Sequence, residues 1–263
     1  MALRRGFDVE TAAPTRALVR PGPAGRIGLI ALATDNTSES DLRAMLPADA
    51  ALFVTRIGFA NPVTAESLAA MREDIPVAAG LLVPGTPLDA VIFGCTSGTA
   101  MIGEAEVARL IRAGRGDVAA VTPLGAVRRA LAAVGAKRVC LLTPYTTEVT
   151  RPICDWLVDE GFDIARAACL ELDDDVAMAS LDPLDIVEAG LAVDDPAAEA
   201  LFVSCTALPA ARFVASLEKR LGKPVIASNQ ALAWQAMRIA GATGDLPGPG
   251  YLMTCHMPGE AAA

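Results

Sequence analysis

Residues 90–96, AVIFGCT, and residues 200–206, ALFVSCT, are two copies of one pattern, and this pattern decides the predicted fold. Each copy starts with an apolar run of strand length, continues with a small residue, and ends on a cysteine followed by a threonine. Short apolar runs of this kind are typical of buried strands. Two copies in one chain predict two structural halves related by duplication.

A second correspondence links the beginnings of the two halves. Residues 26–39 read RIGLIALATDNTSE and residues 137–148 read KRVCLLTPYTTE, with Thr34 matched to Thr143. Each stretch ends a strand and supplies hydroxyl side chains that are suited to capping a following helix. A weaker third pair is VTPLGA at residues 121–126 against ASNQAL at residues 227–232.

Strand and helix patterns alternate along the chain, which predicts parallel strands joined by helical crossovers. The predicted fold is therefore α/β, with two pseudo-twofold-related halves, each a parallel sheet flanked by helices. Residues 77–83 fit either a strand or the end of a helix. The other strand candidates are residues 27–33, 52–55, 90–93 and 118–121, and the helical patterns cover residues 39–46 and 104–113.

The domain boundaries follow from this repeat. Residues 1–24, which contain three prolines, predict an extended N-terminal arm. Residues 25–125 form the first lobe together with residues 232–263, because the helix after Leu232 is expected to pack back on the first half. Residues 126–231 form the second lobe, and the active site is expected in the cleft between the lobes. An arm of this kind often covers a neighbouring subunit, so a homo-oligomer, either a dimer or a tetramer, is expected.

Composition excludes several classes of partner. The chain has 263 residues, 53% of them hydrophobic, and a net charge of −9. The negative charge argues against nucleic acid, which proteins bind largely through lysine and arginine. No apolar run is long enough to cross a bilayer, and the N-terminus does not read as a secretory signal, so a cytoplasmic protein with no membrane partner is expected. A small carboxylate remains a suitable substrate, because local N–H and O–H groups bind it whatever the overall charge.

The six cysteines include no CxxC pair, and disulfides are not expected in a reducing cytoplasm. Cys140, Cys154 and Cys169 are interpreted as small buried hydrophobes. Cys255 and the single histidine, His256, are too few to form a metal site. The sequence contains no GxGxxG turn, no P-loop and no flavin or pyridoxal motif, so chemistry without a cofactor is expected.

Cys95 and Cys205 are the candidate catalytic residues. Both stand at the carboxyl end of a predicted strand, which is the edge where ligands bind in such sheets. A helix predicted to begin directly after each cysteine would lower the pKa of the thiol and offer N–H groups to a carboxylate. One thiolate would then take a proton from carbon, or add to it, while the other thiol protonates the opposite face. The alternative is that both are buried structural cysteines.

At these residues the sequence resembles the aspartate/glutamate racemase superfamily. The resemblance extends from residue 25 to residue 251, and its most specific elements are FGCTSG at residues 93–98, TPY at residues 143–145 and VSCT at residues 203–206. The most similar branch holds maleate isomerases, arylmalonate decarboxylases and the ectoine-utilisation protein A family. Residues 28–35 and 37–39 resemble the last of these most.

The resemblance implies roles for individual residues. Cys95 would attack the substrate and Cys205 would supply the proton. Arylmalonate decarboxylases have glycine at the first cysteine position, so a simple decarboxylation is not expected here. The implied substrate-binding residues are Asp35, Asn36, Thr96, Ser97, Tyr145, Thr206 and Asn229.

Each of these polar residues also has a purely structural interpretation. Thr96 and Thr206 would then cap helices, Tyr145 would be a packing residue, and Asn36 and Asn229 would stabilise turns. The sequence leaves open whether Asp35 or its neighbour faces the ligand. If Asp35 does, the site favours a substrate amino group over a second carboxylate.

The leading hypothesis is a two-thiol racemase or isomerase that acts beside a carboxylate without a cofactor. The resemblance suggests an acylated diaminobutyrate substrate in ectoine degradation. Maleate cis–trans isomerisation is the alternative within the same class. A cytoplasmic carboxylate-binding protein without catalytic activity is the alternative from another class.

Overall fold

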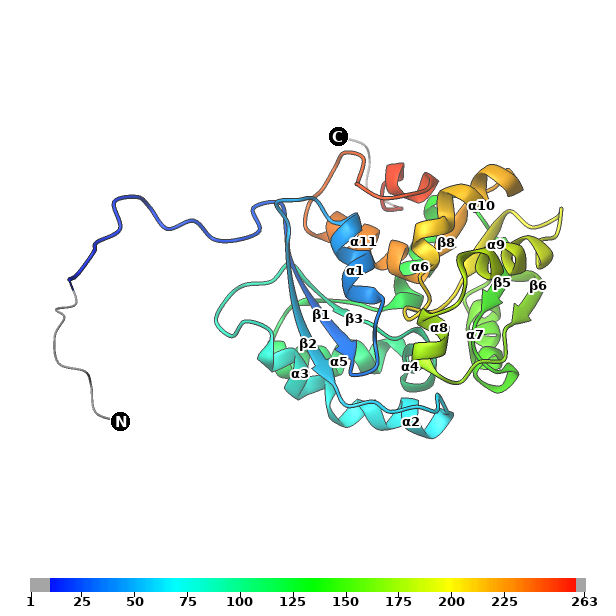
Figure 1. Ribbon diagram of the computed structural model, residues 1–263, viewed down its shortest axis with the longest axis horizontal. Helices are drawn as coiled ribbons and strands as arrows, with labels where there is room; N and C mark the ends of the chain where they lie inside the picture. The colour runs from blue at the N-terminus through cyan, green and yellow to red at the C-terminus, as the bar shows by residue number, and fades with distance from the viewer. Residues whose placement is uncertain (1–9, 259–263) are drawn as a thin grey trace.

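The computed structural model describes residues 10–258, and its strands form two sheets with the same order (Figure 1). The four-stranded sheets run β2-β1-β3-β4 and β6-β5-β7-β8. All pairings between neighbouring strands are parallel. The duplicated α/β fold predicted from the sequence is therefore confirmed. The strands are β1 (Arg26–Leu32), β2 (Ala51–Ile57), β3 (Ala90–Phe93), β4 (Ala119–Val121), β5 (Arg138–Thr143), β6 (Asp163–Cys169), β7 (Ala200–Val203) and β8 (Val225–Ala227).

The central strands of both sheets are buried along almost their whole length. Every residue of β3 and β7 is buried, and only the first residue of β1 and of β5 is not. Helices cover both faces of such parallel sheets, so their inner strands read as continuous apolar runs. This is why the AVIF and ALFV segments were recognisable in the sequence.

The strand registers correct one predicted correspondence. Ile27 pairs with Ala90 in the first sheet, and Val139 pairs with Ala200 in the second. Ile27 is therefore equivalent to Val139. The predicted match of Thr34 with Thr143 had instead made Ala136 the equivalent of Ile27. Thr143 is the last residue of β5, whereas Thr34 lies beyond the end of β1 at Leu32, so the two threonines do not occupy equivalent positions. The loops that follow the two first strands are consequently not equivalent, and they bring different side chains to the centre of the protein.

The structure also settles the open assignment of residues 77–83, most of which lie in helix α3. Pro76 occupies the first turn of this helix, a position that proline favours. Val77 and Leu81 are exposed on it, so the apolar run was not a sign of a buried strand.

The helices are α1 (Ser38–Met45), α2 (Ala65–Ala70), α3 (Ile75–Leu81), α4 (Thr96–Ile102), α5 (Glu104–Arg115), α6 (Pro123–Ala133), α7 (Thr147–Asp159), α8 (Asp175–Ala179), α9 (Pro183–Ala192), α10 (Val214–Leu221) and α11 (Ser228–Ile239), with short 3₁₀ turns η1 (Met71–Glu73), η2 (Ala210–Phe213) and η3 (Tyr251–Thr254).

Helices α6 and α11 follow the last strand of each half and pack against each other. Helix α11 also contacts α1, β3 and β4 of the first half, and α6 contacts β8 of the second. Nearly every residue of α11 is buried, as expected for a helix enclosed on all sides. Trp234 at its centre is fully buried, and its Nε1 donates a hydrogen bond to the Cys255 carbonyl at 2.8 Å. These two helices therefore join the halves.

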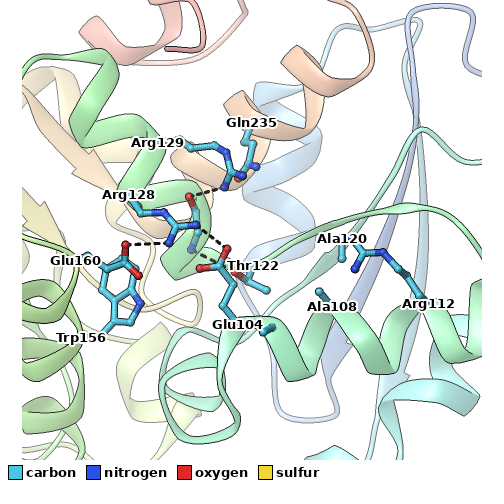
Figure 2. A pocket seen from close by; sticks show the side chains of 12 residues that line it. Glu104, Ala108, Arg112, Ala120, Thr122, Arg128, Arg129, Trp156, Glu160 and Gln235 are labelled. Carbon is cyan, nitrogen blue, oxygen red and sulfur yellow. Dashed lines mark hydrogen bonds and ion pairs between the residues drawn. The ribbon is translucent and has the colours of Figure 1, made fainter. Parts of the chain in front are cut away.

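An arginine adds a polar link at the same junction (Figure 2). Arg128 on α6 pairs with Glu104 on α5 at 3.0 Å and with Glu160 beyond the end of α7 at 2.9 Å. Gly125, one turn earlier, leaves room for this contact, because a Cβ there would lie 2.5 Å from Glu104 Oε1. The two ion pairs thus tie α6 to α5 and to the end of α7.

Residues 10–24 form no helix or strand, and the first part of this segment runs away from the body of the protein (Figure 1). Leu18 and Val19 in this segment are exposed. Residues 1–9 of the predicted arm lie outside the described residues. That the arm covers a neighbouring subunit stays a prediction. None of the helices between residues 10 and 258 is long and apolar enough to cross a membrane.

We expect Trp234→Ala to lower the free energy of unfolding by about 3–5 kcal/mol, because it opens a large cavity in the joint between the halves. Trp234→Phe keeps most of the packing and should cost much less. The Cys255 carbonyl retains its bonds from Arg238 in that variant. Urea titration followed by circular dichroism would measure both changes. Equal and small effects of the two substitutions would contradict this account of the α6–α11 joint.

Candidate active site

Loops that follow the carboxyl ends of β1, β3, β5 and β7 converge with the start of α8 on one small cavity. Both Cys95 and Cys205 line it. The space left between the side chains is about 10 Å³, which is room for roughly one water molecule. We call this space the cysteine cavity. Its lining residues are Leu32, Asp35, Gly94, Cys95, Ser97, Tyr145, Asp175, Cys205, Thr206 and Ala207.

Cys95 stands at the N-cap of α4, as the sequence predicted. Its Sγ accepts a hydrogen bond from the Gly98 backbone N–H at 3.2 Å and lies 3.7 Å from Ser97 Oγ. Gly98 is required by this close approach, since a Cβ there would lie 2.9 Å from the sulfur and 2.5 Å from Met71 Cε. The N-terminal turn of α4 therefore holds the first thiol in place.

Cys205 is positioned differently, and the predicted helix directly after it is wrong. The chain runs through a loop at residues 206–209 before η2 begins. Cys205 adopts a φ of 112°, which is uncommon for a residue with a side chain and recurs at functional sites. This turn directs the Ala207 backbone N–H to Cys205 Sγ at 3.2 Å. A tight turn therefore supplies the donor that α4 supplies to Cys95.

The expected lowering of the thiol pKa values is also wrong. Burial raises the pKa of Cys95 to about 12, and the nearby Asp175 carboxylate raises it further. Burial and Asp175 likewise raise the pKa of Cys205 well above its ordinary value. The cost of taking a thiolate out of water outweighs the N–H groups that both sulfurs accept. Both thiols are consequently protonated at neutral pH when the site is empty.

Side-chain hydroxyls join the two halves behind the cysteines. Ser228 Oγ accepts hydrogen bonds from the Cys205 backbone N–H and from Thr96 Oγ1, both at 3.1 Å. Thr206 Oγ1 donates to the Gly94 carbonyl at 3.0 Å. The Thr96 hydroxyl is therefore turned away from the cavity toward the other half. Sequence reasoning did not single out Ser228, although the weak repeat at residues 227–232 contained it.

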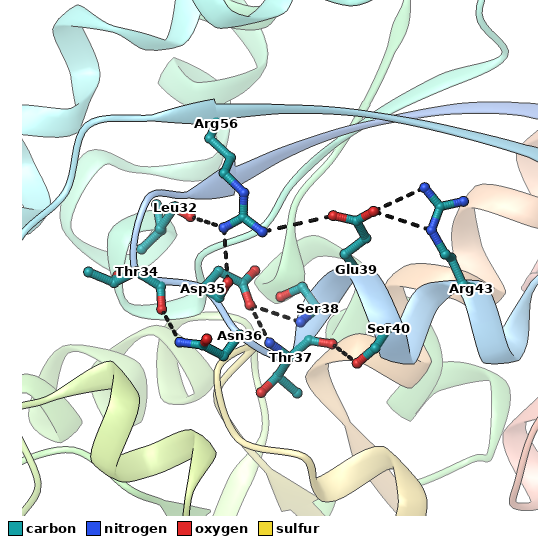
Figure 3. A network of polar contacts seen from close by, with 10 residues as sticks. All are labelled: Leu32, Thr34, Asp35, Asn36, Thr37, Ser38, Glu39, Ser40, Arg43 and Arg56. Carbon is teal, nitrogen blue, oxygen red and sulfur yellow. Dashed lines mark hydrogen bonds and ion pairs between the residues drawn. The ribbon is translucent and has the colours of Figure 1, made fainter.

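Asp35, not Asn36, lines the cavity. Figure 3 shows the hydrogen bonds of the turn that holds both residues. Asp35 Oδ1 accepts hydrogen bonds from the backbone N–H groups of Thr37 at 2.8 Å and Ser38 at 2.9 Å. Its Oδ2 is buried and has no hydrogen-bond partner among residues 10–258. Asn36 is exposed and donates to the Thr34 carbonyl at 2.8 Å. Asp35 therefore faces the cavity and Asn36 stabilises the turn, whereas contact of either residue with a substrate stays a prediction.

Asp175, at the start of α8, is a second carboxylate in the cavity that the sequence analysis missed. It is buried, and its Oδ2 accepts a hydrogen bond from the Thr34 hydroxyl. Burial raises its pKa, and the charges of Asp35 and Asp174 act in the same direction. Asp175 belongs to the run DDD at residues 173–175, which follows no buried strand and resembles a solvated loop. Only the folded chain shows that one of the three turns inward.

Tyr145 and Asn229 differ in their relation to the cavity. Tyr145 lines it, and burial raises the pKa of its phenol well above the usual value, with both cysteine sulfurs close by. Asn229 is buried behind the cavity, where its Nδ2 donates to Asp41 Oδ2 at 3.1 Å and to the Thr206 carbonyl at 2.9 Å. Asn229 therefore supports the loop after Cys205 and does not line the cavity.

The cavity thus combines two thiols, two carboxylates and three residues with hydroxyl groups in a small, largely buried space. Two thiols in one small space can exchange protons with a single carbon, and the Ser97 and Tyr145 hydroxyls can donate to a developing negative charge. Among residues 10–258, no group of three or more histidine, cysteine or acidic side chains is arranged to hold a metal ion.

Comparisons with known proteins agree with this fold. The sequence profile of the arylmalonate decarboxylase family matches residues 64–253. The maleate isomerase of Nocardia farcinica is 26% identical over 240 residues, which is 87% of this chain and 95% of that protein.

Solved structures of the same group superpose over most of the chain. The maleate isomerase Iso of Pseudomonas putida S16 has a TM-score of 0.81 at 24% identity, covering 88% of this chain and 98% of that one. A cysteine-to-serine mutant of the N. farcinica maleate cis–trans isomerase, which carries a covalently bound succinylcysteine intermediate, has a TM-score of 0.80 at 24% identity over the same shares of the two chains.

We expect the alkylation rate of Cys95 by iodoacetamide to rise steadily from about pH 7 to about pH 10 without a plateau, because the thiolate is the reactive species. The pKa of about 12 places the midpoint of the titration above this range. Peptide mass spectrometry would measure the rate at each pH. A plateau below about pH 9 would contradict the raised pKa.

Asp175→Asn should lower the pKa of both cavity thiols and raise the alkylation rate of Cys95 several-fold at about pH 9, because it removes a neighbouring negative charge. Asp173→Asn is the matched control, since Asp173 is an exposed member of the same acidic run. The control should leave the rate unchanged. A rate that is unchanged or lower in Asp175→Asn would show that this carboxylate does not act on the thiols.

Proposed function

Because the chain belongs to the arylmalonate decarboxylase family, we propose that it is a cofactor-independent racemase whose two cysteines act on the α-carbon of an amino acid derivative. The relatives described above are isomerases, and the chain is an enzyme of this family of cysteine-dependent catalysts. The observation that carries the proposal is the acidic character of the cysteine cavity, where Asp35 and Asp175 lie with both thiols.

Asp35 Oδ2 is the atom of the cavity best suited to accept a hydrogen bond from a ligand, because it is buried and has no partner among residues 10–258. A buried carboxylate oxygen without a donor is costly, and a partner that donates hydrogen bonds removes that cost. A substrate ammonium group carries such donors together with a positive charge, so it complements both carboxylates. A dicarboxylate such as maleate would instead bring two more negative charges into a small buried space.

The same charge balance links substrate binding to activation of the thiols. Burial and the Asp175 charge keep both thiols protonated in the empty site. An ammonium group beside the carboxylates offsets their field and lowers the thiol pKa values. One thiol then loses its proton to solvent and becomes the base. A dianionic substrate would act in the opposite direction.

The proposed reaction moves one proton on each side of the α-carbon. The thiolate of one cysteine takes the Cα proton and becomes a thiol, and the electron pair of the C–H bond moves into the adjacent carboxylate. The other cysteine then donates its proton to the opposite face of the carbon and becomes the thiolate. No atom other than hydrogen is exchanged, and the reverse reaction uses the same two groups with their roles swapped.

Ser97 and Tyr145 are suited to stabilise the charge on the substrate carboxylate during this step. Both line the cavity, and Tyr145 lies near both sulfurs. Removing one fixed donor of this kind typically costs about 2.7–4 kcal/mol of barrier. Thr206 contributes through its position, because its hydroxyl is bonded to Gly94 and holds the two loops together.

Substrate entry requires the cavity to widen, since it has room for only about one water molecule. We propose that the lobes predicted from the sequence, residues 25–125 with residues 232–263 and residues 126–231, separate slightly to admit the substrate and close over it. Closure would exclude water and strengthen the polar contacts inside.

The finer identity of the substrate is proposed from the likeness of residues 28–35 and 37–39 to ectoine-utilisation proteins. An N-acetylated diaminobutyrate, a product of ectoine degradation, has one carboxylate and one free amino group, which is the charge pattern that the cavity favours. Maleate is the second candidate, and its support is the similarity to maleate isomerases.

The test is to incubate single enantiomers of Nα-acetyl- and Nγ-acetyl-2,4-diaminobutyrate, aspartate and glutamate with the enzyme and to follow inversion by chiral chromatography. Maleate is assayed in parallel by proton NMR. We expect inversion of an acetylated diaminobutyrate, with Cys95→Ala and Cys205→Ala each slower by about 10²–10⁴-fold. Conversion of maleate to fumarate without inversion of any amino acid would overturn the proposal in favour of the second candidate.

Asp35→Asn should shift the preference of the site from ammonium to carboxylate. The amide oxygen can still accept the N–H bonds of Thr37 and Ser38, so the turn is preserved while the charge is lost. We expect the KM for the amino acid substrate to rise at least about tenfold, as for loss of a charged hydrogen bond, and maleate to bind more tightly. Asn36→Ala, an exposed change in the same turn, is the control. An unchanged preference in Asp35→Asn would contradict the role of this carboxylate.

A further inference from the structure

A second, larger hollow lies between α5, α6, α7 and α11 (Figure 2). Its volume is about 550 Å³, within the range of small-molecule sites. It shares no lining residue with the cysteine cavity. We call it the arginine groove, and its lining residues are Glu104, Ala105, Ala108, Arg112, Ala120, Thr122, Gly125, Arg128, Arg129, Trp156, Glu160 and Gln235.

The groove is locally positive in a chain whose net charge is −9. Arg128 is neutralised within the groove by Glu104 and Glu160. Arg129 donates one hydrogen bond, to the Gly125 carbonyl at 3.2 Å, and has no acidic partner among residues 10–258. Arg112 lines the groove without an ion pair in the same part of the chain. Two guanidinium groups therefore remain available to an anion.

Gln235 provides an independent sign that a ligand belongs here. It projects from α11 into the groove, is 3% exposed, and its Oε1 is buried with no hydrogen-bond partner among the described residues. Figure 2 shows Gln235 and Arg129 directed into the groove from α11 and α6. An unpartnered buried amide oxygen costs about 1–3 kcal/mol, and a ligand hydroxyl or N–H removes that cost.

The remaining lining fits the carbon part of a small molecule. The Trp156 ring is half-buried on one side, and Ala105, Ala108 and Ala120 form an apolar wall on the other. Sites with an apolar wall and a few placed polar groups are typical of metabolite binding. The groove thus offers charge, a hydrogen-bond acceptor and an apolar surface within one space.

We propose that the arginine groove binds a small organic anion, a phosphate or a carboxylate, that carries a hydroxyl or amide donor next to the anionic group. Arg112 and Arg129 hold the anion, and Gln235 accepts the hydrogen bond from the neighbouring donor. The ligand contacts helices of both halves, so its binding stabilises the folded protein. This site is separate from the proposed racemase chemistry.

The test is calorimetric titration of the whole protein with glycerol 3-phosphate, propyl phosphate and malate. Glycerol 3-phosphate and propyl phosphate differ in their hydroxyl groups, and malate shows whether a carboxylate serves as well. We expect saturable binding, with glycerol 3-phosphate tighter than propyl phosphate. Arg112→Glu should weaken the binding by about tenfold or more, as expected for a charge-assisted hydrogen bond. Arg109→Glu, on the exposed face of the same helix but outside the groove, should change it by less than about twofold.

The variant Gln235→Leu tests ligand recognition by Gln235 without weakening the folded protein. It should abolish the preference for glycerol 3-phosphate over propyl phosphate, while the melting temperature of the ligand-free protein stays the same or rises, because a buried unpaired oxygen is removed. Equal losses in Arg112→Glu and Arg109→Glu would reduce the effect to general surface charge and overturn the proposal. Absence of saturable binding by all three probes, or an unchanged preference in Gln235→Leu, would also overturn it.

Discussion

The geometry of the cysteine cavity depends on hydrogen bonds that cross between the two halves directly behind the thiols. Ser228 Oγ receives the Cys205 backbone N–H and the Thr96 hydroxyl, and the Thr206 hydroxyl reaches the Gly94 carbonyl. The Thr96–Ser228 and Thr206–Gly94 bonds each join the loop after one cysteine-bearing strand to the other half, and the Cys205–Ser228 bond holds Ser228 in place within the second half. Duplication alone would produce two similar sheets, whereas these bonds set the sheets so that both sulfurs line one space.

Within that arrangement, the two halves have diverged in a way that suits an asymmetric substrate. The turn after β1 contributes the Asp35 carboxylate, whereas the turn after β5 contributes the Tyr145 hydroxyl. Asp175 adds a second negative charge and raises the pKa of both thiols. On the proposed mechanism, a substrate of positive charge offsets this effect and lowers the pKa of the thiols. This links substrate selection and proton transfer in one electrostatic balance.

Sequence patterns predicted the features that repeat or that form continuous runs. The apolar segments AVIF and ALFV identified central strands, and their repetition identified Cys95 and Cys205 as a pair. Features that depend on packing were not predictable. Burial, which no local pattern reports, reversed the expected pKa shift of the thiols. Asp175 comes from an acidic run that looks solvated, and the positive φ of Cys205 leaves no mark in its residue type. The apolar run at residues 77–83 left strand and helix open, because its letters do not show that Val77 and Leu81 are exposed on a helix.

The central claim is that two thiols act on opposite faces of one carbon. It is tested most directly by whether deuterium from the solvent first appears in the product or in the remaining substrate. A single enantiomer of the substrate is incubated in D₂O, and both enantiomers are separated at low conversion and analysed by mass spectrometry. The account predicts one deuterium in nearly all of the product and none in the remaining substrate, because the proton that is added comes from the second thiol. Product that retains the original hydrogen, or substrate that exchanges as fast as it inverts, would contradict a two-thiol mechanism.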